Sequence, residues 1–145
     1  MSMHSFLMGA NVVAFQKNNK KYGMTCAWAM QVDYDKIMML LGSQSVTGKM
    51  ISKNDIIGVS ALSKNQEKIA NNFGDGHSNE RDKFINIDYA LDDGAILINN
   101  AKTRMKVEVL EVYHLDMIKD DHLVLGLIKE SFQEDGSFLS LEDLE

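Results

Sequence analysis

The sequence predicts a mainly β domain, a closed or nearly closed antiparallel barrel with two or three short helices. Its apolar residues come in bursts of strand length instead of long helical stripes, at 10–15, 36–42, 56–62, 95–98, 104–115 and 122–128. The chain has no proline, so its turns must be made by Gly, Asn, Asp and Ser. Only two segments carry helix signals, and closure of a barrel removes the exposed edges that so many strands would otherwise present.

Two of these bursts carry finer signals. The first is followed by the pair Asn18-Asn19 and then by YGMTCAWAM, residues 22–30, which together indicate a β-hairpin. In the burst at 104–115, Met105 and Val107 alternate with charged residues until the phase slips at Leu110. Such a slip is what a β-bulge produces.

A helix is predicted after Ser63, in the run KNQEKIANNF. Gln66 stands three residues on, as in a capping box, and Ile69 and Phe73 fall on one face at a spacing of four. Gly74 is placed to end the helix. A second, shorter helix is predicted for residues 47–53, with the apolar residues at 50 and 51 facing inward.

Composition sets the broad class. A length of 145 residues fits one domain, which we expect at 1–130, followed by a solvated acidic tail at 131–145. The single cysteine excludes an internal disulfide, and no leader pattern opens the chain, so we expect the cytoplasm. No apolar run approaches the roughly 20 residues of a membrane span. The net charge of −6 makes nucleic acid an unfavourable partner.

The stretch GSQSVTGKM, residues 42–50, follows an apolar strand and opens the shorter helix. It fails the P-loop pattern, because five residues separate the first Gly from Gly-Lys and Met50 follows. Its hydroxyls and one cation can still hold a phosphate group, namely Ser43, Ser45, Thr47 and Lys49. An ordinary helix capped by Ser or Thr explains the same residues, and the spacing alone leaves both interpretations open.

Metal and nucleophile chemistry find little support. The histidines are dispersed and no HxxxH or CxxC occurs, so we expect no metal site; they are His4, His77, His114 and His122. Cys26 stands alone beside Trp28, and a small buried apolar residue is the better interpretation than a nucleophile.

Five pieces in order resemble the flavin reductase-like family of FMN-binding split barrels, to which the flavoredoxins belong. They are MTCAW at 24–28, SQSVTGKMI at 43–51, IIGVSALSKNQEKIANNFG at 56–74, RDKF at 81–84 and DHLVLGLI at 121–128. The resemblance runs from about residue 8 to residue 130. It implies a Greek-key-like split β-barrel that binds FMN noncovalently, near the subunit interface of a homodimer.

The resemblance also implies site residues. The turn along the flavin ring falls on Met24, Thr25, Cys26, Ala27 and Trp28. The phosphate-binding segment falls on Ser43, Gln44, Ser45, Thr47 and Lys49. The strand end facing the cofactor falls on Ser60, Ala61 and Leu62, and the loop near the flavin or the dimer contact falls on Lys83 and Phe84. His122 falls near the nicotinamide side, where it orients or protonates, although a purely structural histidine fits the sequence equally.

The function that this resemblance implies is an NAD(P)H-dependent flavin oxidoreductase, passing electrons from NADH or NADPH through FMN to an acceptor. One alternative is a flavoredoxin-like electron carrier, reduced by a redox protein partner without any nicotinamide site. Another is a split-barrel binding module that has lost flavin. The last is favoured by one departure from the family, Tyr22-Gly23 in place of the asparagine usual before Met-Thr.

Overall fold

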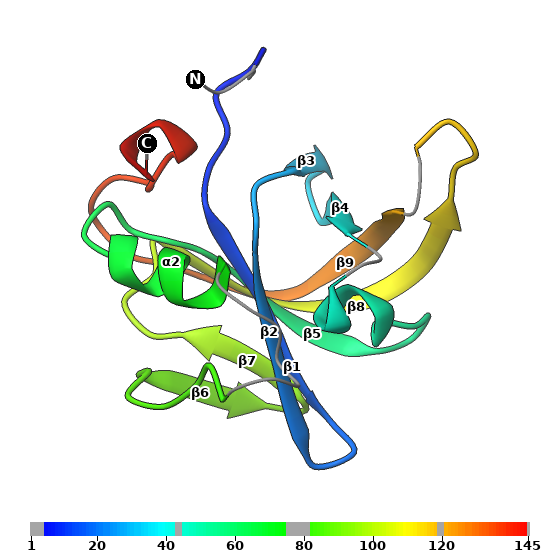
Figure 1. Cartoon of the computed structure of the whole chain (residues 1–145), viewed down its shortest axis with the longest axis horizontal. Helices are drawn as coiled ribbons and strands as arrows, with labels where there is room; N and C mark the ends of the chain where they lie inside the picture. Colours follow the sequence, from blue (N-terminus) through cyan, green and yellow to red (C-terminus); the bar gives the residue numbers. More distant parts are fainter. Residues whose placement is uncertain (1–4, 43–44, 75–81, 119–120, 145) are drawn as a thin grey trace.

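The computed structural model describes residues 5–42, 45–74, 82–118 and 121–144 (Figure 1). Within them one antiparallel sheet is built from β1 Asn11–Lys17, β2 Lys20–Cys26, β3 Ala29–Asp33, β4 Lys36–Gly42, β5 Ile56–Ala61, β6 Tyr89–Asp92, β7 Ala95–Ile98, β8 Thr103–His114 and β9 Asp121–Gln133. The helical elements are α1 Val46–Lys49, α2 Glu67–Gly74 and a 3-10 turn, Leu141–Leu144. The predicted mainly β split barrel with two or three short helices is confirmed.

The barrel wall follows the order β3-β4-β9-β8-β5-β1, and β2 pairs with the remaining edge of β1. The other edge of β1 serves two neighbours, since residues 11–14 pair with β5 while Phe15 pairs with Ala95 of β7. At the end of β2 the Leu40 amide of β4 donates to the Trp28 carbonyl at 2.8 Å. Because Ala29 pairs with Met39, this bond extends the β3–β4 ladder by one residue. Among the described strands β2 forms no ladder with β4.

Strand β1 is buried on both faces and separates two apolar cores. Val13 and Phe15 pack inside the barrel with apolar side chains of β4, β5, β8 and β9. Val12 and Ala14 point the other way and pack with Phe73 of α2 and with side chains of β7. Successive side chains of a strand alternate between faces, so the unbroken apolar run of β1 supplies both cores. Figure 1 shows α2 and the β6–β7 hairpin on the outer side of this central strand.

The turn and bulge predictions are confirmed. Asn18 and Asn19 take φ values of 55° and 64° at the tip of the β1–β2 hairpin, and such left-handed values suit Asn. In the β8–β9 ladder the register shifts between Val109 and Glu111, which leaves Leu110 as the extra residue.

Helix α2 ends at Gly74 as predicted and begins later than predicted, at Glu67. The Gln66 side chain accepts from the Ser63 amide at 2.9 Å, which is one half of a capping box. The Ser63 hydroxyl instead donates to the Asn100 carbonyl at 2.7 Å, so residues 63–66 form a turn ahead of the helix.

Helix α1 is one turn long, and the prediction of a helix to residue 53 is wrong in length. Its expected apolar face is confirmed, because Ile51 is buried and Met50 packs against the barrel interior. The amide of Asn54, just beyond, donates to Val109 of β8 at 2.8 Å, which draws the chain into the next strand instead of continuing the helix.

The prediction of a solvated tail is wrong for part of the last fifteen residues. Strand β9 runs through residue 130, where we expected the domain to end, and continues to Gln133. Leu139 is 0% exposed and packs in the outer core. Its amide donates to Leu62 and its carbonyl accepts from Ala10, each at 2.9 Å. The apolar residues of the segment SFLSL, residues 137–141, explain why this part of the tail packs against the domain. Burial of one leucine side chain stabilises a fold by roughly 1.5–3 kcal/mol.

Two strands were not predicted. Strand β3 presents exposed residues at four of its five positions, and β6 is four residues long, so neither has the apolar run that marked the others. As for membrane crossing, none of the helices in the described ranges has the length and apolar character that it requires.

Candidate functional site

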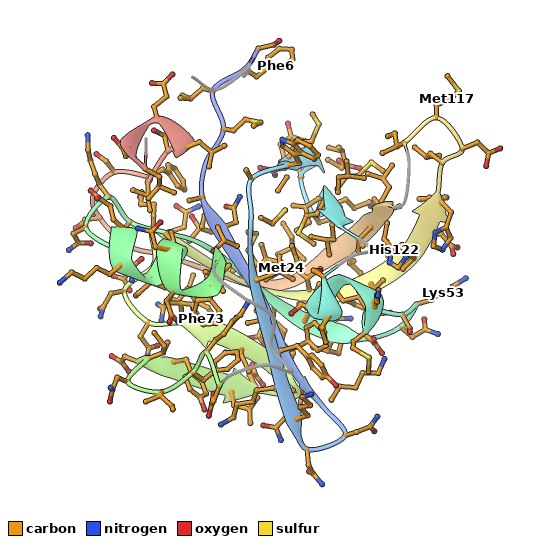
Figure 2. All side chains as sticks on the ribbon, in the orientation of Figure 1. Phe6, Met24, Lys53, Phe73, Met117 and His122 are labelled. Atoms are coloured by element: carbon orange, nitrogen blue, oxygen red, sulfur yellow. The ribbon has the colours of Figure 1, made fainter. Side chains whose placement is uncertain are left out.

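Strand β2 lies at the centre of the candidate site, between α1 and α2. Figure 2 shows Met24 at the middle of the molecule, with Phe73 of α2 to one side of it and His122 to the other. Because β2 pairs with β1 alone among the described strands, its other edge is not covered by a ladder. Each helix therefore contacts β2 through side chains, and the two contacts are unlike.

The α2 side of β2 is tightly packed. A Cβ atom built on Gly23 would lie 2.6 Å from the Phe73 ring and 3.0 Å from Phe84, so only glycine fits there. The two phenylalanine rings meet edge to face with centroids 5.1 Å apart. The Thr25 hydroxyl donates to the Ala70 carbonyl of α2 at 2.6 Å. Gly23, which stands where the family usually has asparagine, is thus required by the approach of α2.

Lys83 also connects β2 to α2. Its side chain is only 4% exposed, and its ammonium group donates to the Phe73 carbonyl at 3.0 Å and the Gly23 carbonyl at 3.2 Å. The Phe73 carbonyl belongs to the last turn of α2, where a cation is favourable. The geometry therefore places Lys83 as a link between α2 and β2, and Phe84 as part of the outer core.

The α1 side is a polar turn. Ser45 caps α1 by accepting from the Gly48 amide at 2.8 Å, and its hydroxyl donates to the Gly42 carbonyl at 2.9 Å. The same hydroxyl oxygen lies 3.4 Å from the Met24 sulfur. A Cβ atom on Gly48 would lie 2.5 Å from the Gly42 carbonyl oxygen, so glycine lets the turn fold back on the end of β4.

The remaining residues of this turn differ in exposure. Thr47 is buried, while Lys49 is exposed to solvent beside it. The predicted phosphate residues Ser43 and Gln44 lie outside the residues that the structure describes. Among the residues it does describe, the turn offers Lys49 as its solvent-exposed cation.

At the end of β2 the chain passes from buried to exposed. Cys26 is buried, its thiol lies 3.7 Å from the Leu40 carbonyl, and burial raises the pKa of this thiol to about 12. The thiolate is thus absent at neutral pH, in agreement with a packing role. Ala27 is half-buried and Trp28 is 56% exposed. The predicted ring-binding stretch therefore offers its surface mainly through its last two residues.

The strand end 60–62 joins this region through β1. Asn11 of β1 pairs with Cys26 on one side and Ala61 on the other, and its side chain donates to the Cys26 carbonyl at 3.0 Å. Ser60 and Leu62 are fully buried, and the Ser60 hydroxyl accepts from the Ile98 amide. Only half-buried Ala61 presents side-chain surface next to the end of β2.

His122 lies on β9, which pairs with β4 on the side away from β3. It pairs with Leu41 of β4 and His114 of β8, and its Nδ1 lies 3.2 Å from the Gly48 carbonyl oxygen. The structure thus brings His122 into contact with the α1 turn at Gly48.

A cavity of about 630 Å³ lies next to the end of β2, and sequence reasoning missed most of its lining. It is bordered by Asn11 of β1, Met30 of β3, Tyr34 in the turn after β3, Ala61 of β5, Met105 of β8, and Phe138. The one signal for it was Asn11, a polar residue opening the otherwise apolar run of β1.

Strand β3 also carries a large exposed apolar face. Alternate residues from the end of β2 onward have exposed fractions of 43% to 97%; they are Trp28, Met30, Val32 and Tyr34. We call these four residues the β3 stripe. Trp28 precedes β3, Tyr34 follows it, and the β3–β4 register shifts between Gln31 and Asp33. Large exposed apolar side chains that follow one another along a segment in this way mark an interaction surface. In the described part of the chain no three His, Cys, Asp or Glu side chains gather closely enough to bind a metal ion.

An antiparallel split barrel with an edge strand set between a polar turn and a packed helix defines a class of small split-barrel domains. Within that class the chain belongs to the flavin reductase-like family, since the family model described as "Flavin reductase like domain" matches residues 3–139. Family membership identifies the chain as a flavin-related oxidoreductase domain.

Solved structures share the fold at low identity. The NADH:FAD oxidoreductase SgcE6 of Streptomyces globisporus C-1027 superposes with a TM-score of 0.81 at 23% identity, covering 93% of this chain and 82% of that one. A flavoredoxin from Methanosarcina acetivorans gives 0.79 at 15% identity, with coverages of 93% and 75%. An FMN-binding protein from Thermus thermophilus, with bound 1-cyclohex-2-enone, gives 0.80 at 18% identity, with coverages of 92% and 74%. No curated protein matches the chain.

Proposed function

We propose that the protein binds FMN noncovalently on the α1 side of β2 and acts as an NAD(P)H-dependent flavin oxidoreductase. One observation carries the proposal. The two segments that the family resemblance assigns to the flavin, residues 24–28 and 43–49, are in contact through the Ser45 hydroxyl and the Met24 sulfur, 3.4 Å apart. Beside them the Cys26 thiol, at the end of β2, lies 3.7 Å from the Leu40 carbonyl of β4.

The residues present fit a flavin phosphate at the α1 turn. Lys49 is exposed and supplies a positive charge, and the Ser45 hydroxyl lies at the same turn. This hydroxyl now donates to the Gly42 carbonyl, so it would exchange that bond for one to a phosphate oxygen. Gly48 keeps the turn close to β4, because any side chain there would collide with Gly42. We assign Ser45, Thr47 and Lys49 to the phosphate, with buried Thr47 supporting the turn from behind.

The residues at the end of β2 fit the flavin ring. Ala27 and Trp28 are at least partly exposed and adjoin Ala61, which gives a short apolar wall beside polar backbone. When bound, FMN supplies a ring that accepts a hydride from a reduced nicotinamide and returns the electrons to an acceptor. The chain's part is to hold the ring at the end of β2, exclude water with Trp28 and position its phosphate with Lys49.

We also propose a homodimer formed through the β3 stripe. All four of its large apolar side chains are exposed, and Met30 and Tyr34 border the cavity of about 630 Å³ next to Ala29 and Ala61. A second copy covering it would shelter the ring site from solvent. Val32→Lys is expected to yield a monomer in sedimentation equilibrium, and a wild-type protein that is monomeric at micromolar concentration would contradict this assembly.

The proposal is tested by the visible absorbance of the purified protein with added FMN, under anaerobic conditions, before and after NADH and then NADPH. Flavin bands that bleach with either nicotinamide support the oxidoreductase. Bands that persist until dithionite is added contradict it in favour of the electron carrier. An FMN spectrum unchanged by excess protein contradicts flavin binding. The internal bonds of the Ser45 and Ser60 hydroxyls are the observation that favours this last outcome.

A further inference from the structure

His122 and the α1 turn meet at one residue, Gly48, whose two flanking peptide groups are held separately. The Gly48 amide donates to the Ser45 hydroxyl at 2.8 Å, and the Gly48 carbonyl oxygen lies 3.2 Å from His122 Nδ1. The Gly48 peptides are thus held from two directions, by a side chain of the turn and by a side chain of β9. The Ile51 amide is 3.5 Å from the same carbonyl, so His122 makes the shorter contact.

The chemistry of this contact determines which ring nitrogen of His122 carries a proton. A carbonyl oxygen only accepts, so Nδ1 of His122 must carry hydrogen and donate it. The His114 ring packs edge-on against the His122 ring, with centroids 4.6 Å apart and an interplanar angle of 89°. His114 is the cross-strand partner of His122 on β8, and its ring takes no part in the hydrogen bond between Nδ1 and Gly48.

The connection reaches from the strand ladder to Lys49. β4 and β9 pair at Leu41 and His122, one residue before Gly42, where the turn begins. Gly42 anchors one end of the turn through the Ser45 hydroxyl, and His122 anchors the other at Gly48. Lys49 follows Gly48 directly, so the orientation of that peptide sets where the Lys49 side chain starts.

We propose that His122 is a positioning residue for the phosphate group of the flavin, acting through the Gly48 carbonyl on the turn that carries Ser45 and Lys49. This role rests on the proposed flavin site and differs from the nicotinamide-side role that the family resemblance implies. It requires a hydrogen-bond donor at the position of Nδ1 and no proton transfer.

The test compares FMN with riboflavin, which has the same ring and no phosphate. His122→Ala is expected to lower FMN affinity about tenfold, because one hydrogen bond that orders the turn is lost, and to leave riboflavin affinity unchanged. His122→Asn places an amide donor near the position of Nδ1 and should restore FMN affinity to within about threefold of wild type. His114→Ala keeps the bond to Gly48 and is the matched control, with an effect below about threefold on either ligand.

Dissociation constants come from flavin fluorescence titrations, with the melting temperature of each variant measured alongside. Equal FMN affinity in wild type and His122→Ala overturns the proposal, as does an equal loss for riboflavin or a failure of His122→Asn to rescue. A different result would show that the proposed flavin site itself is wrong. If wild type binds FMN no more tightly than riboflavin, there is no phosphate site at the turn, and the proposed function fails before His122 is considered.

Discussion

The two sides of β2 contrast in how their polar groups are used. Towards α2, the Lys83 ammonium and the Thr25 hydroxyl donate to backbone carbonyls, and phenylalanine rings fill the space around them. Towards α1, the contact is a single polar turn, with Ser45 touching Met24 and Lys49 open to solvent. One side builds the fold, and the other leaves charge and surface for a ligand.

This difference means that the residues assigned to the flavin do not all have the same role. Residues assigned to the flavin by family resemblance fall into those whose side chains are consumed by packing and those whose side chains remain accessible. The packed group is Thr25, Cys26, Thr47, Ser60, Leu62, Lys83 and Phe84. The accessible or partly accessible group is Met24, Ala27, Trp28, Ser45, Lys49 and Ala61. Substitutions in the first group should change stability, and those in the second should change ligand affinity.

The largest effect is expected for Lys83→Met. Loss of two charge-assisted hydrogen bonds to the Phe73 and Gly23 carbonyls should lower the free energy of unfolding by about 2–4 kcal/mol. The matched control is Lys49→Met on the opposite side, an exposed lysine, with an effect within about 0.5 kcal/mol. Urea denaturation measures both, and equal effects would erase the contrast between the two sides.

Gly23→Ala should come next. The added methyl group would sit 2.6 Å from the Phe73 ring, and overpacking of this kind costs about 1–3 kcal/mol. Thermal unfolding checks the direction. A combined Gly23→Ala, Phe73→Leu variant that regains part of the loss would confirm that this ring is the obstacle, and a Gly23→Ala protein as stable as wild type would contradict the packing described here.

Lys49→Ala tests whether the α1 side of β2 binds the ligand. Loss of one exposed cation from the phosphate turn is expected to weaken FMN binding about fivefold, with riboflavin binding and stability unchanged. Lys53→Ala is the control, since Lys53 is also exposed but faces Glu111 at 3.3 Å. If the two variants bind FMN alike, the assignment of the phosphate to this turn is wrong.

The smallest effect is expected at Cys26. Burial raises its pKa to about 12, so the thiolate is populated only near or above that pH. A thiol reagent at pH 8 should leave the folded protein unmodified and label the chain fully in denaturant. Labelling of the folded protein at the rate of the unfolded chain would place Cys26 at the surface.

Local signals predicted much of the fold. Asn18-Asn19 forms the turn, Leu110 the bulge and Gly74 the helix end, because each depends on residues close in sequence. The Asp93-Gly94 pair was an available hairpin signal for β6, with φ values of 52° and 96°, and it was overlooked. Strand β3 offered no burial pattern, since four of its five residues are exposed, polar and apolar alike.

Long-range contacts set the limit of prediction. Nothing near Lys83 in sequence indicates that its ammonium group meets Gly23, sixty residues away. Leu139 reaches the outer core only because Ala10 and Leu62 offer backbone groups on either side of it. The family resemblance assigns Met24 and Ser45 to the same cofactor, whereas their contact, like that of His122 with Gly48, required the structure.

Trp28 provides the most direct test of the account, because it is the only tryptophan and stands 56% exposed at the end of β2. If FMN binds on the α1 side with its ring at this end, titration with FMN should quench Trp28 emission saturably, with one flavin per chain. Lys49→Ala should shift that curve to higher FMN concentration, and Lys53→Ala should not. Flavin binding detected by absorbance while Trp28 emission stays constant would contradict the account.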